Sequence, residues 1–359
     1  MSRSVITILI VLLLVALIAA VVLIPDQHKG TSLTFTYQPM GTYCRIVVAT
    51  GTDRNAARAA ADAALDKIQA IEALASTYQP RSEISQLSNL NPGSPRDLSP
   101  QMYTVFERSL YYSRLTNGAF DITVGPLMDL WRTAAQRSTP PTSDQIATAL
   151  KAVGYRNISL DHQASTITFS QPHMSITLDA IVKGYAADLA LGAIRQAGAT
   201  AALVDLGGDI VCFGQPPSRL AWNIAIQNPF KPATAVMDTS PGSTLSTIAL
   251  TDAAVATSGN YQRTFSIQGR AYSQILDPRT GQPVTQAPSV TVIAPTAADA
   301  DALATACSVL PVSQALQLIN RIPNTEALLI TGSPHAPTFH TSTGFEKYLL
   351  SPLTQPSRK

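Results

Sequence analysis

Two oxygen-bearing side chains stand out in a segment that is otherwise rich in alanine. Asp301 and Thr305 lie four residues apart within residues 298–306. On a helix, this spacing places both side chains on one side. A carboxylate and a hydroxyl are hard oxygen ligands, which suit Mg²⁺ that also keeps waters and substrate phosphate oxygens. The pair indicates a divalent-cation site; the alternative is that Asp301 is an ordinary charge on a helix surface.

A second candidate segment, residues 177–188, carries polar and small residues where a predicted strand gives way to a predicted helix. Backbone N–H groups at the start of a helix suit a phosphate, because they are unpaired and lie at the positive end of the helix dipole. The ammonium group of Lys183 adds a positive charge there. The segment favours phosphate binding, with a solvated lysine in the first helical turn as the alternative.

Glycine and turn chemistry mark two further segments. Gly207 and Gly208 follow a predicted strand and precede Asp209, and paired glycines let a backbone approach a ligand closely. The alternative is a plain tight turn. Ser258 and Gly259 are followed by the segment 272–283, which contains Asp-Pro and Thr-Gly pairs typical of turns. A hairpin with a long loop is the alternative for that region.

The elements that would position these residues follow from hydrophobic periodicity. Apolar residues at helical spacing with interleaved charges predict an amphipathic helix over 56–74. Further helices are predicted over 101–115, 143–152, 182–196 and 298–309. A strand pair is predicted within 34–49, and single strands over 158–160, 166–169, 203–211, 222–227, 247–256, 264–267 and 290–293. Strands and helices mix without strict strand–helix–strand alternation, which predicts an α+β fold of mixed sheets and helices.

Composition excludes several classes of protein. The 359 residues allow two domains or one large one, and 45% are hydrophobic, enough for a sizeable core. With 25 basic and 23 acidic residues, the formal charge of +2 argues against nucleic-acid binding through a global positive field. The three cysteines are odd in number and widely spaced, which argues against a disulfide framework and a CxxC metal site; they are Cys44, Cys212 and Cys307.

The N-terminal residues 1–30 contain a membrane signal. Residues 5–24 are apolar except for Thr7, and 20 helical residues span about 30 Å, the thickness of the hydrocarbon core. Arg3 keeps the N-terminus cytoplasmic by the positive-inside rule. We predict a single-pass transmembrane anchor, with a cleaved signal peptide as the alternative. Residues 31–350 then form one large domain, with a surface excursion at 232–243, and residues 351–359 form a tail.

The order and spacing of these segments resemble the ApbE family, the FAD:protein FMN transferases. Each motif is modest in specificity, but their shared order makes coincidence improbable. Besides the four segments above, the resemblance rests on Met40-Gly41-Thr42, on residues 76–89 with Tyr78, on residues 118–127 with Asp121, and on residues 343–348. It covers about residues 35–348, almost everything outside the anchor.

The resemblance implies an enzyme that binds FAD with Mg²⁺, or with Mn²⁺ in its place. It would transfer FMN to a Thr or Ser hydroxyl of an acceptor protein and release AMP. By the same resemblance, the metal ligands are Asp301, Thr305 and the backbone carbonyl of Ala180. The positions that bind FAD are Met40, Tyr78, Asp121, Thr123, Gly207, Gly208, Asp209, Ser258 and Gly259. The catalytic positions are Lys183, Gln274 and Asp277.

The sequence departs from the family pattern at two places. Most members have a histidine, a candidate base for the acceptor hydroxyl, where this chain has Gln274. A glutamine side chain orients a hydroxyl or a water but takes no proton near neutral pH. The second departure is Thr177-Leu178-Asp179-Ala180, where the family usually has an acidic residue at the first position. Residues two apart on a strand share a face, so Asp179 could compensate in part.

The leading hypothesis is therefore an active FMN transferase. The domain would lie on the periplasmic side of a bacterial inner membrane and would modify a membrane or exported redox protein. Gln274 motivates the runner-up, an FAD-binding protein with weak or no transferase activity. A third hypothesis is an FAD pyrophosphatase that passes FMN to water. A purely structural role is the last, and it does not explain a site assembled from so many separate segments.

Overall fold

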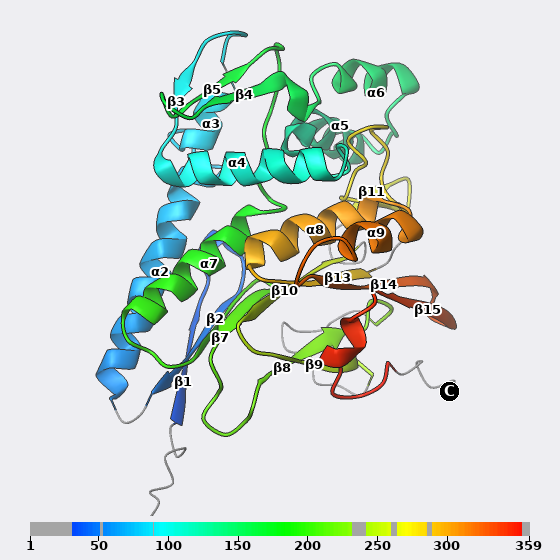
Figure 1. Ribbon diagram of the computed structural model, residues 1–359. Coiled ribbons are helices and arrows are strands. Elements are labelled where there is room, and N and C mark those ends of the chain that lie inside the picture. The colour runs from blue at the N-terminus through cyan, green and yellow to red at the C-terminus, as the bar shows by residue number, and fades with distance from the viewer. Residues whose placement is uncertain are drawn as a thin grey trace, which may run out of the picture.

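An eight-stranded antiparallel sheet forms the centre of the fold (Figure 1). The structure is a computed structural model that describes residues 31–50, 53–88, 90–231, 242–259, 264–285 and 289–353. The strand order is β1-β2-β6-β7-β10-β13-β14-β15. The strands are β1 (Thr31–Tyr37), β2 (Cys44–Thr50), β6 (Ala202–Leu206), β7 (Asp209–Phe213), β10 (Ala253–Gly259), β13 (Ser289–Ala294), β14 (Glu326–Ser333) and β15 (Ala336–Thr341).

Both faces of the central sheet are buried, because alternate residues of each strand point to opposite sides. Ile46, Val204 and Val211 are register partners across β2, β6 and β7, and all three belong to the core beneath the helices. Leu203 and Cys212 pair one position along and belong to a separate core on the other face. The apolar runs of these strands follow from this burial on two sides.

Helices cover one face of the sheet (Figure 1). They are α2 (Arg54–Ala75), α7 (Val182–Gln196), α8 (Ala297–Val309) and α9 (Val312–Ile319). Almost every residue of α8 is buried, because small apolar side chains occupy all sides of the helix. A polar side chain on such a helix therefore faces either another polar group or a cavity.

The opposite face of the sheet is covered by a two-stranded sheet and a short helical turn. These are β8 (Trp222–Gln227), β9 (Thr244–Leu250) and η4 (Phe345–Tyr348). Trp222, Ile248 and Phe345 join the second core there. This layer contributes no residue to the candidate site described below.

Most of the remaining elements pack above the helical face, at the top of Figure 1. The helices are α3 (Glu83–Leu87), α4 (Pro100–Leu115), α5 (Gly125–Gln136) and α6 (Ser143–Leu150), with short turns η1 (Pro39–Gly41), η2 (Ile122–Val124) and η3 (Tyr155–Asn157). The strands are β3 (Arg96–Asp97), β4 (Ile158–Asp161), β5 (Thr166–Phe169), β11 (Thr264–Ile267) and β12 (Arg270–Ser273). A third, small core joins α5, α6 and β11 through Leu127, Trp131, Ile146 and Phe265.

The predicted α+β class is confirmed, as are the predicted helices, but two predicted strands are wrong. Residues 203–211 form two strands, β6 and β7, because Gly207 and Gly208 make a tight turn with φ of +65° and +94°. Residues 247–256 belong to β9 and β10, which lie in different sheets. Asp252 turns the chain between them with φ of +49°. The sequence patterns did not predict α3, α5, α9, β3, β12, β14 or β15.

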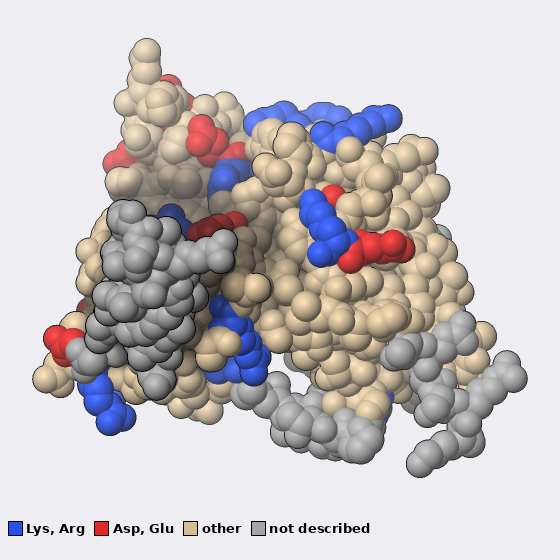
Figure 2. Space-filling view, turned by 60° about the horizontal axis from the view of Figure 1, so that its bottom comes forward, with Lys and Arg blue, Asp and Glu red and all other residues tan. Residues whose placement is uncertain are grey.

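Some sequence predictions lie outside the described residues. These are the membrane segment at 5–24, most of the excursion at 232–243 and most of the tail at 351–359. Within the described ranges, no helix is both long and apolar enough to span a bilayer. On the face visible in Figure 2, charged side chains form scattered groups on a largely uncharged surface, as expected when only 13% of residues are charged.

Candidate active site

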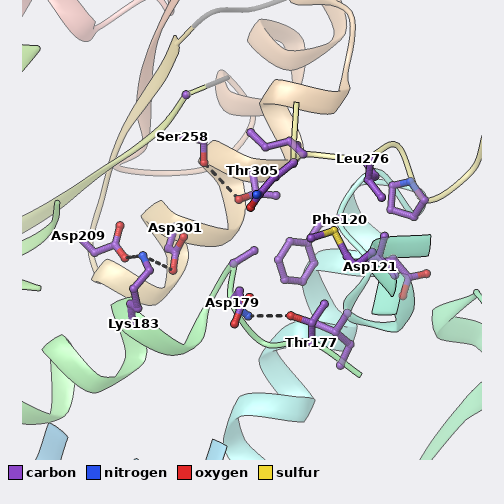
Figure 3. Close-up of a pocket in the computed structure, with 18 of the residues that line it drawn as sticks. Phe120, Asp121, Thr177, Asp179, Lys183, Asp209, Ser258, Leu276, Asp301 and Thr305 are labelled. Carbon is purple, nitrogen blue, oxygen red and sulfur yellow. Dashed lines mark hydrogen bonds and ion pairs between the residues drawn. The ribbon is translucent and has the colours of Figure 1, made fainter. Parts of the chain in front are cut away.

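A cavity of about 230 Å³ lies where the first turn of α7 and the side of α8 that carries Asp301 and Thr305 meet the ends of the sheet strands (Figure 3). Its wall is built from well-separated stretches of chain, so only the tertiary structure brings them together. The predicted site residues that line it are Asp121, Ala180, Lys183, Gly207, Asp209, Ser258, Gly259, Gln274, Asp301 and Thr305. The other predicted residues, Met40, Tyr78, Thr123, Gly208 and Asp277, do not line it.

Lys183 joins two carboxylates at one end of the cavity. Its Nζ forms an ion pair with Asp209 and lies 4.0 Å from Oδ2 of Asp301. Figure 3 shows the ammonium group between the two carboxylates. Lys183 stands in the first turn of α7, and Asp209 begins β7 directly after the glycine turn. The start of α7 therefore positions the ammonium group of Lys183, and the turn before β7 positions the carboxylate of Asp209.

Asp301 is buried, and its charge is incompletely satisfied. Its Oδ2 has no hydrogen-bond partner among the described residues. Burial raises the pKa of Asp301 well above its usual range, and the nearby charge of Asp209 raises it further. A buried carboxylate oxygen that makes no hydrogen bond, and only a 4.0 Å ion pair with Lys183, is costly without a ligand and fits a bound cation.

Further oxygen atoms stand near Asp301 in the cavity wall. Thr305 lies one helical turn further along α8, and its Oγ1 is 3.2 Å from Oγ of Ser258 at the end of β10. Ala180, in the turn before α7, also lines the cavity and can offer its backbone carbonyl. Carboxylate, hydroxyl and carbonyl oxygens form a donor set that suits Mg²⁺ or Mn²⁺. The residues present therefore fit a divalent cation.

The candidate cation ligands in this cavity include few side-chain carboxylates. Across the described part of the chain, no group of three or more His, Cys, Asp or Glu side chains is arranged to hold a metal ion. A site in this cavity would need the Thr305 hydroxyl, the Ala180 carbonyl and oxygens of water or of a substrate to complete it. This is how Mg²⁺ commonly binds, with few protein ligands and several phosphate or water oxygens.

The glycine turn between β6 and β7 contributes backbone to the cavity. Gly207 lines the cavity, and a Cβ atom added to it would lie 2.6 Å from Oγ1 of Thr42. Its positive φ and this close approach both require glycine. Gly208 does not line the cavity, and its N–H donates to Oδ1 of Asp205 at 3.1 Å. Gly208 therefore serves only the turn, whereas Gly207 serves the turn and also brings the backbone into the cavity wall.

Asp121 and Thr123 form a buried polar unit beside the cavity. Oδ1 of Asp121 accepts from the Thr123 backbone N–H at 2.9 Å and from its hydroxyl at 2.7 Å, and Oδ2 accepts from the Tyr155 N–H at 2.7 Å. Burial raises the pKa of Asp121, while these hydrogen bonds lower it. Thr123 lies behind Asp121, and its hydroxyl also accepts from the Gly154 N–H at 2.7 Å. Thr123 thus orients Asp121 and does not face the cavity.

The two predicted catalytic residues at 274 and 277 have different surroundings. Gln274 is half-buried and lines the cavity. The carboxylate of Asp277 is held by the guanidinium of Arg279 through two contacts of 2.8 Å, and its backbone carbonyl accepts the N–H of Gly281. Asp277 organises the turn that places its neighbours Leu276 and Pro278 in the cavity wall. A direct catalytic role for Asp277 has no support from this geometry.

Met40 and Tyr78, predicted at the flavin, lie outside the cavity lining. Met40 sits in η1 with φ of +54°, a conformation unusual for a side chain of its type, and packs against the main core. Tyr78, just after α2, is 92% exposed. An aromatic side chain this exposed has no packing partner that fixes its position, so a ligand would have to order it.

The structure also brings in residues that the sequence analysis did not select. Thr42, Phe120, Thr177 and Asp179 line the cavity, and all four lie within segments that the sequence analysis singled out, although it placed none of them among the site residues. Asp179 is exposed, and its backbone N–H lies 3.4 Å from Oγ1 of Thr177. Position within a recognised segment was therefore the available signal, but it does not tell which side chain faces inward.

Comparison with known proteins supports this assembly of residues. The sequence model of the ApbE family matches residues 40–329. An FAD:protein FMN transferase from Treponema pallidum is 31% identical over 309 residues, which cover 81% of this chain and 82% of that protein. One from Klebsiella pneumoniae is 30% identical over 300 residues, which cover 82% of this chain and 83% of that protein.

Solved structures resemble the fold over most of the chain. The ApbE protein of Thermotoga maritima superimposes with a TM-score of 0.77 at 29% identity, covering 89% of this chain and 99% of that one. The flavinyl transferase ApbE of Pseudomonas stutzeri, in its apo form, gives a TM-score of 0.77 at 25% identity, covering 90% of this chain and 98% of that one. The likeness therefore extends through the strands and helices that build the cavity.

Proposed function

The chain belongs to the ApbE family, and we propose that it transfers FMN from FAD to an acceptor protein. One observation carries the proposal: Asp301, Thr305, Lys183 and Ser258, from three separate elements, converge on one cavity. In the reaction, an acceptor hydroxyl oxygen bonds to the FMN phosphorus. The bond from that phosphorus to the bridging oxygen breaks, AMP leaves, and the hydroxyl proton is released.

The charges in the cavity support a requirement for a divalent cation. Four carboxylates, of Asp121, Asp179, Asp209 and Asp301, line the cavity with a single lysine, Lys183. The pyrophosphate of FAD is anionic, so these carboxylates would repel it without added positive charge. Asp301, Thr305 and the Ala180 carbonyl would hold Mg²⁺, or Mn²⁺. When bound, the cation neutralises charge on the phosphate oxygens and aligns the leaving group.

The remaining cavity residues bind and orient. Lys183, whose charge is shared between Asp209 and Asp301, holds an ammonium group beside the position of the phosphates. Ser258 keeps the Thr305 hydroxyl in place through their 3.2 Å contact. Gly207 lets the backbone of the β6–β7 turn come close to a ligand. Positioning and electrostatic stabilisation of this kind supply most of the catalysis in phosphoryl transfer.

Gln274 favours a second candidate function. It lines the cavity, where most family members carry histidine, and its amide orients the acceptor hydroxyl without taking its proton. Slow deprotonation of the acceptor would leave a protein that binds FAD and transfers FMN weakly or not at all. Attack by water in place of the acceptor would make the chain an FAD pyrophosphatase.

The acceptor and location follow from the N-terminal sequence. The apolar run at 5–24 behind Arg3 favours a single-pass anchor in a bacterial inner membrane, with the domain on the periplasmic side. The acceptor is then a membrane or exported redox protein with a Thr or Ser to modify. The bacterial origin of the related transferases is consistent with this.

The test uses the full-length chain in detergent with FAD, Mg²⁺ and a Thr-bearing domain of an exported flavoprotein. Mass spectrometry follows the acceptor and chromatography follows AMP. We expect the acceptor to gain one FMN with matching AMP, and the Asp301→Asn variant to yield neither. AMP with free FMN and no labelled acceptor would indicate the pyrophosphatase. FAD retained on the chain without either product, over several acceptors, would overturn the transferase.

A further inference from the structure

Of the two helices that carry the charged end of the cavity, α7 caps the start of α8. Asp188 of α7 reaches the start of α8, where its Oδ1 accepts from the Ala297 N–H at 2.7 Å and its Oδ2 accepts from the Ala298 N–H at 3.0 Å. On the other side, the backbone N–H of Gly184, in the first turn of α7, acts on Asp301 of α8 and lowers the pKa of that carboxyl. The Asp188 carboxylate of α7 therefore satisfies two free N–H groups in the first turn of α8.

Contact between the backbones fixes the same junction. A Cβ atom added to Gly184 would lie 2.3 Å from the Ala297 carbonyl oxygen, so the two helices touch at that point. Gly184 and Asp188 are four residues apart and share one side of α7. The start of α8 is therefore held at two adjacent points along α7. Figure 1 shows the upper end of α7 meeting the start of α8.

The junction lies one helical turn from the proposed cation ligand. Asp301 is four residues after Ala297 on α8, while Lys183 directly precedes Gly184 on α7. A shift of the first turn of α8 would therefore move the Asp301 carboxylate relative to Lys183 and to the Ala180 carbonyl. Ligand geometry is strict for Mg²⁺, so such a shift weakens binding even when every ligand is present.

A second anchor keeps α8 docked independently of Asp188. Arg108 of α4 lies on the start of α8, with Nη1 donating to Thr296 Oγ1 at 3.3 Å and Nη2 at 3.3 Å from Asp299 Oδ1. Thr296 also caps α8 by accepting from the Asp299 N–H at 3.2 Å. Loss of Asp188 would thus reposition the first turn of α8 and leave the helix attached.

We propose that Asp188 is a positioning residue for the cation site, acting through the first turn of α8 to set the carboxylate of Asp301. The inference rests on the proposed function only in taking Asp301 as a cation ligand. In Asp188→Asn, one backbone N–H of α8 meets an amide N–H₂ in place of an acceptor, so the turn must move. In Asp188→Glu, both acceptor oxygens and the charge remain, on a side chain longer by one methylene.

The experiment measures Mn²⁺ binding to the full-length chain in detergent, without FAD or acceptor, by electron paramagnetic resonance of the free ion. The matched control is Asp53→Asn, because Asp53 also accepts from two helix N–H groups, those of Asn55 and Ala56, but at the far α2. We expect Asp188→Asn to raise the Kd for Mn²⁺ about tenfold or more. Asp188→Glu should recover part of this loss, and Asp53→Asn should stay within about twofold of the wild type.

Three results would overturn the inference. These are a Kd within about twofold of wild type in Asp188→Asn, an equal loss in Asp53→Asn, and no Mn²⁺ binding by the wild-type chain. The melting temperatures of Asp188→Asn and Asp53→Asn show whether a general loss of stability explains a change in the Kd for Mn²⁺. Because FAD and acceptor are absent, a wild-type chain that binds Mn²⁺ but transfers no FMN would overturn the proposed function and leave this inference standing.

Discussion

The two ends of the candidate site are built in different ways. At the charged end, Asp301, Asp209 and Gly184 are buried and stand on helices or strands that cap and contact one another. At the end where the family resemblance places the flavin, Tyr78 is 92% exposed and Met40 lies outside the cavity lining. The charged end is preorganised by packing, whereas the flavin end leaves side chains for the ligand to order.

The difference indicates which substitutions should affect stability and which should affect only binding. Buried groups in contact with backbone can shift only by disturbing their neighbours, since protein interiors are close-packed. Exposed side chains can change without cost to the fold. The following variants test this contrast.

The largest effect on stability is expected from Gly184→Ala. The added Cβ would lie 2.3 Å from the Ala297 carbonyl oxygen, so α7 and α8 must separate. We expect the free energy of unfolding to fall by about 1–3 kcal/mol, and kcat/KM for transfer to fall about 100-fold. Gly192→Ala is the matched control, because the same added atom on the same helix meets nothing within 4 Å. It should raise stability by about 0.5–1 kcal/mol. Equal behaviour of the two variants in denaturant melts would refute a tight junction.

Asp301→Asn should abolish cation-dependent transfer while sparing the fold. Removing one preorganised electrostatic group costs roughly 10²–10³ in kcat. Burial raises the pKa of Asp301, which means that its charge destabilises the native state as pH rises above the carboxyl's usual range. The variant should therefore melt no lower than the wild type at pH 8 without metal. A melting temperature well below wild type would show that Asp301 serves mainly the fold.

Gln274→His restores the histidine that most family members carry at this position of the cavity wall. A general base contributes about 10²–10⁴ to rate when suitably placed, so transfer should rise at least about tenfold. The rate of the variant should increase with pH through the range near the usual histidine pKa of about 6.5, as the imidazole loses its proton. The rate of the wild type should not show this increase with pH. An unchanged rate and pH profile would show that deprotonation at this position does not limit transfer.

Tyr78→Ala should act on binding alone. Loss of aromatic contact with the flavin would cost about 0.5–1.5 kcal/mol, which raises the KM for FAD about two- to twelvefold. The melting temperature should not change, because the side chain is exposed. Tyr111→Ala is the control, as Tyr111 is 51% exposed on α4. An equal KM in both variants would remove Tyr78 from the flavin site.

The smallest effect is expected from thiol labelling of the folded chain. Burial raises the pKa of Cys307 on α8 to about 12, and that of Cys44 at the start of β2 to about 12. Both thiols then stay protonated at pH 8, and the thiolate is the reactive form. We expect no reaction with iodoacetamide until the chain is unfolded. Rapid labelling of Cys307 would show that α8 opens and that the charged end is not rigid.

Local pattern determined much of this protein. The helical period of residues 56–74 predicts α2 because one face must be buried, and the mixing of strands and helices without strict alternation predicts an α+β fold. The paired oxygens of Asp301 and Thr305 were visible because α8 is otherwise apolar. Turn positions were harder: Gly207-Gly208 and Asp252 each end a strand, and apolar composition alone does not show where a strand ends.

Tertiary structure alone decided which residues meet. Thr123 and Asp277 lie in the predicted segments, yet their side chains bind Asp121 and Arg279, respectively, and do not line the cavity. Asp188 looks like an ordinary helix charge in sequence, and only the crossing of α7 and α8 brings it to the Ala297 N–H. The physical reason is that sequence spacing fixes neighbours within one element, whereas contacts between elements depend on how whole faces pack.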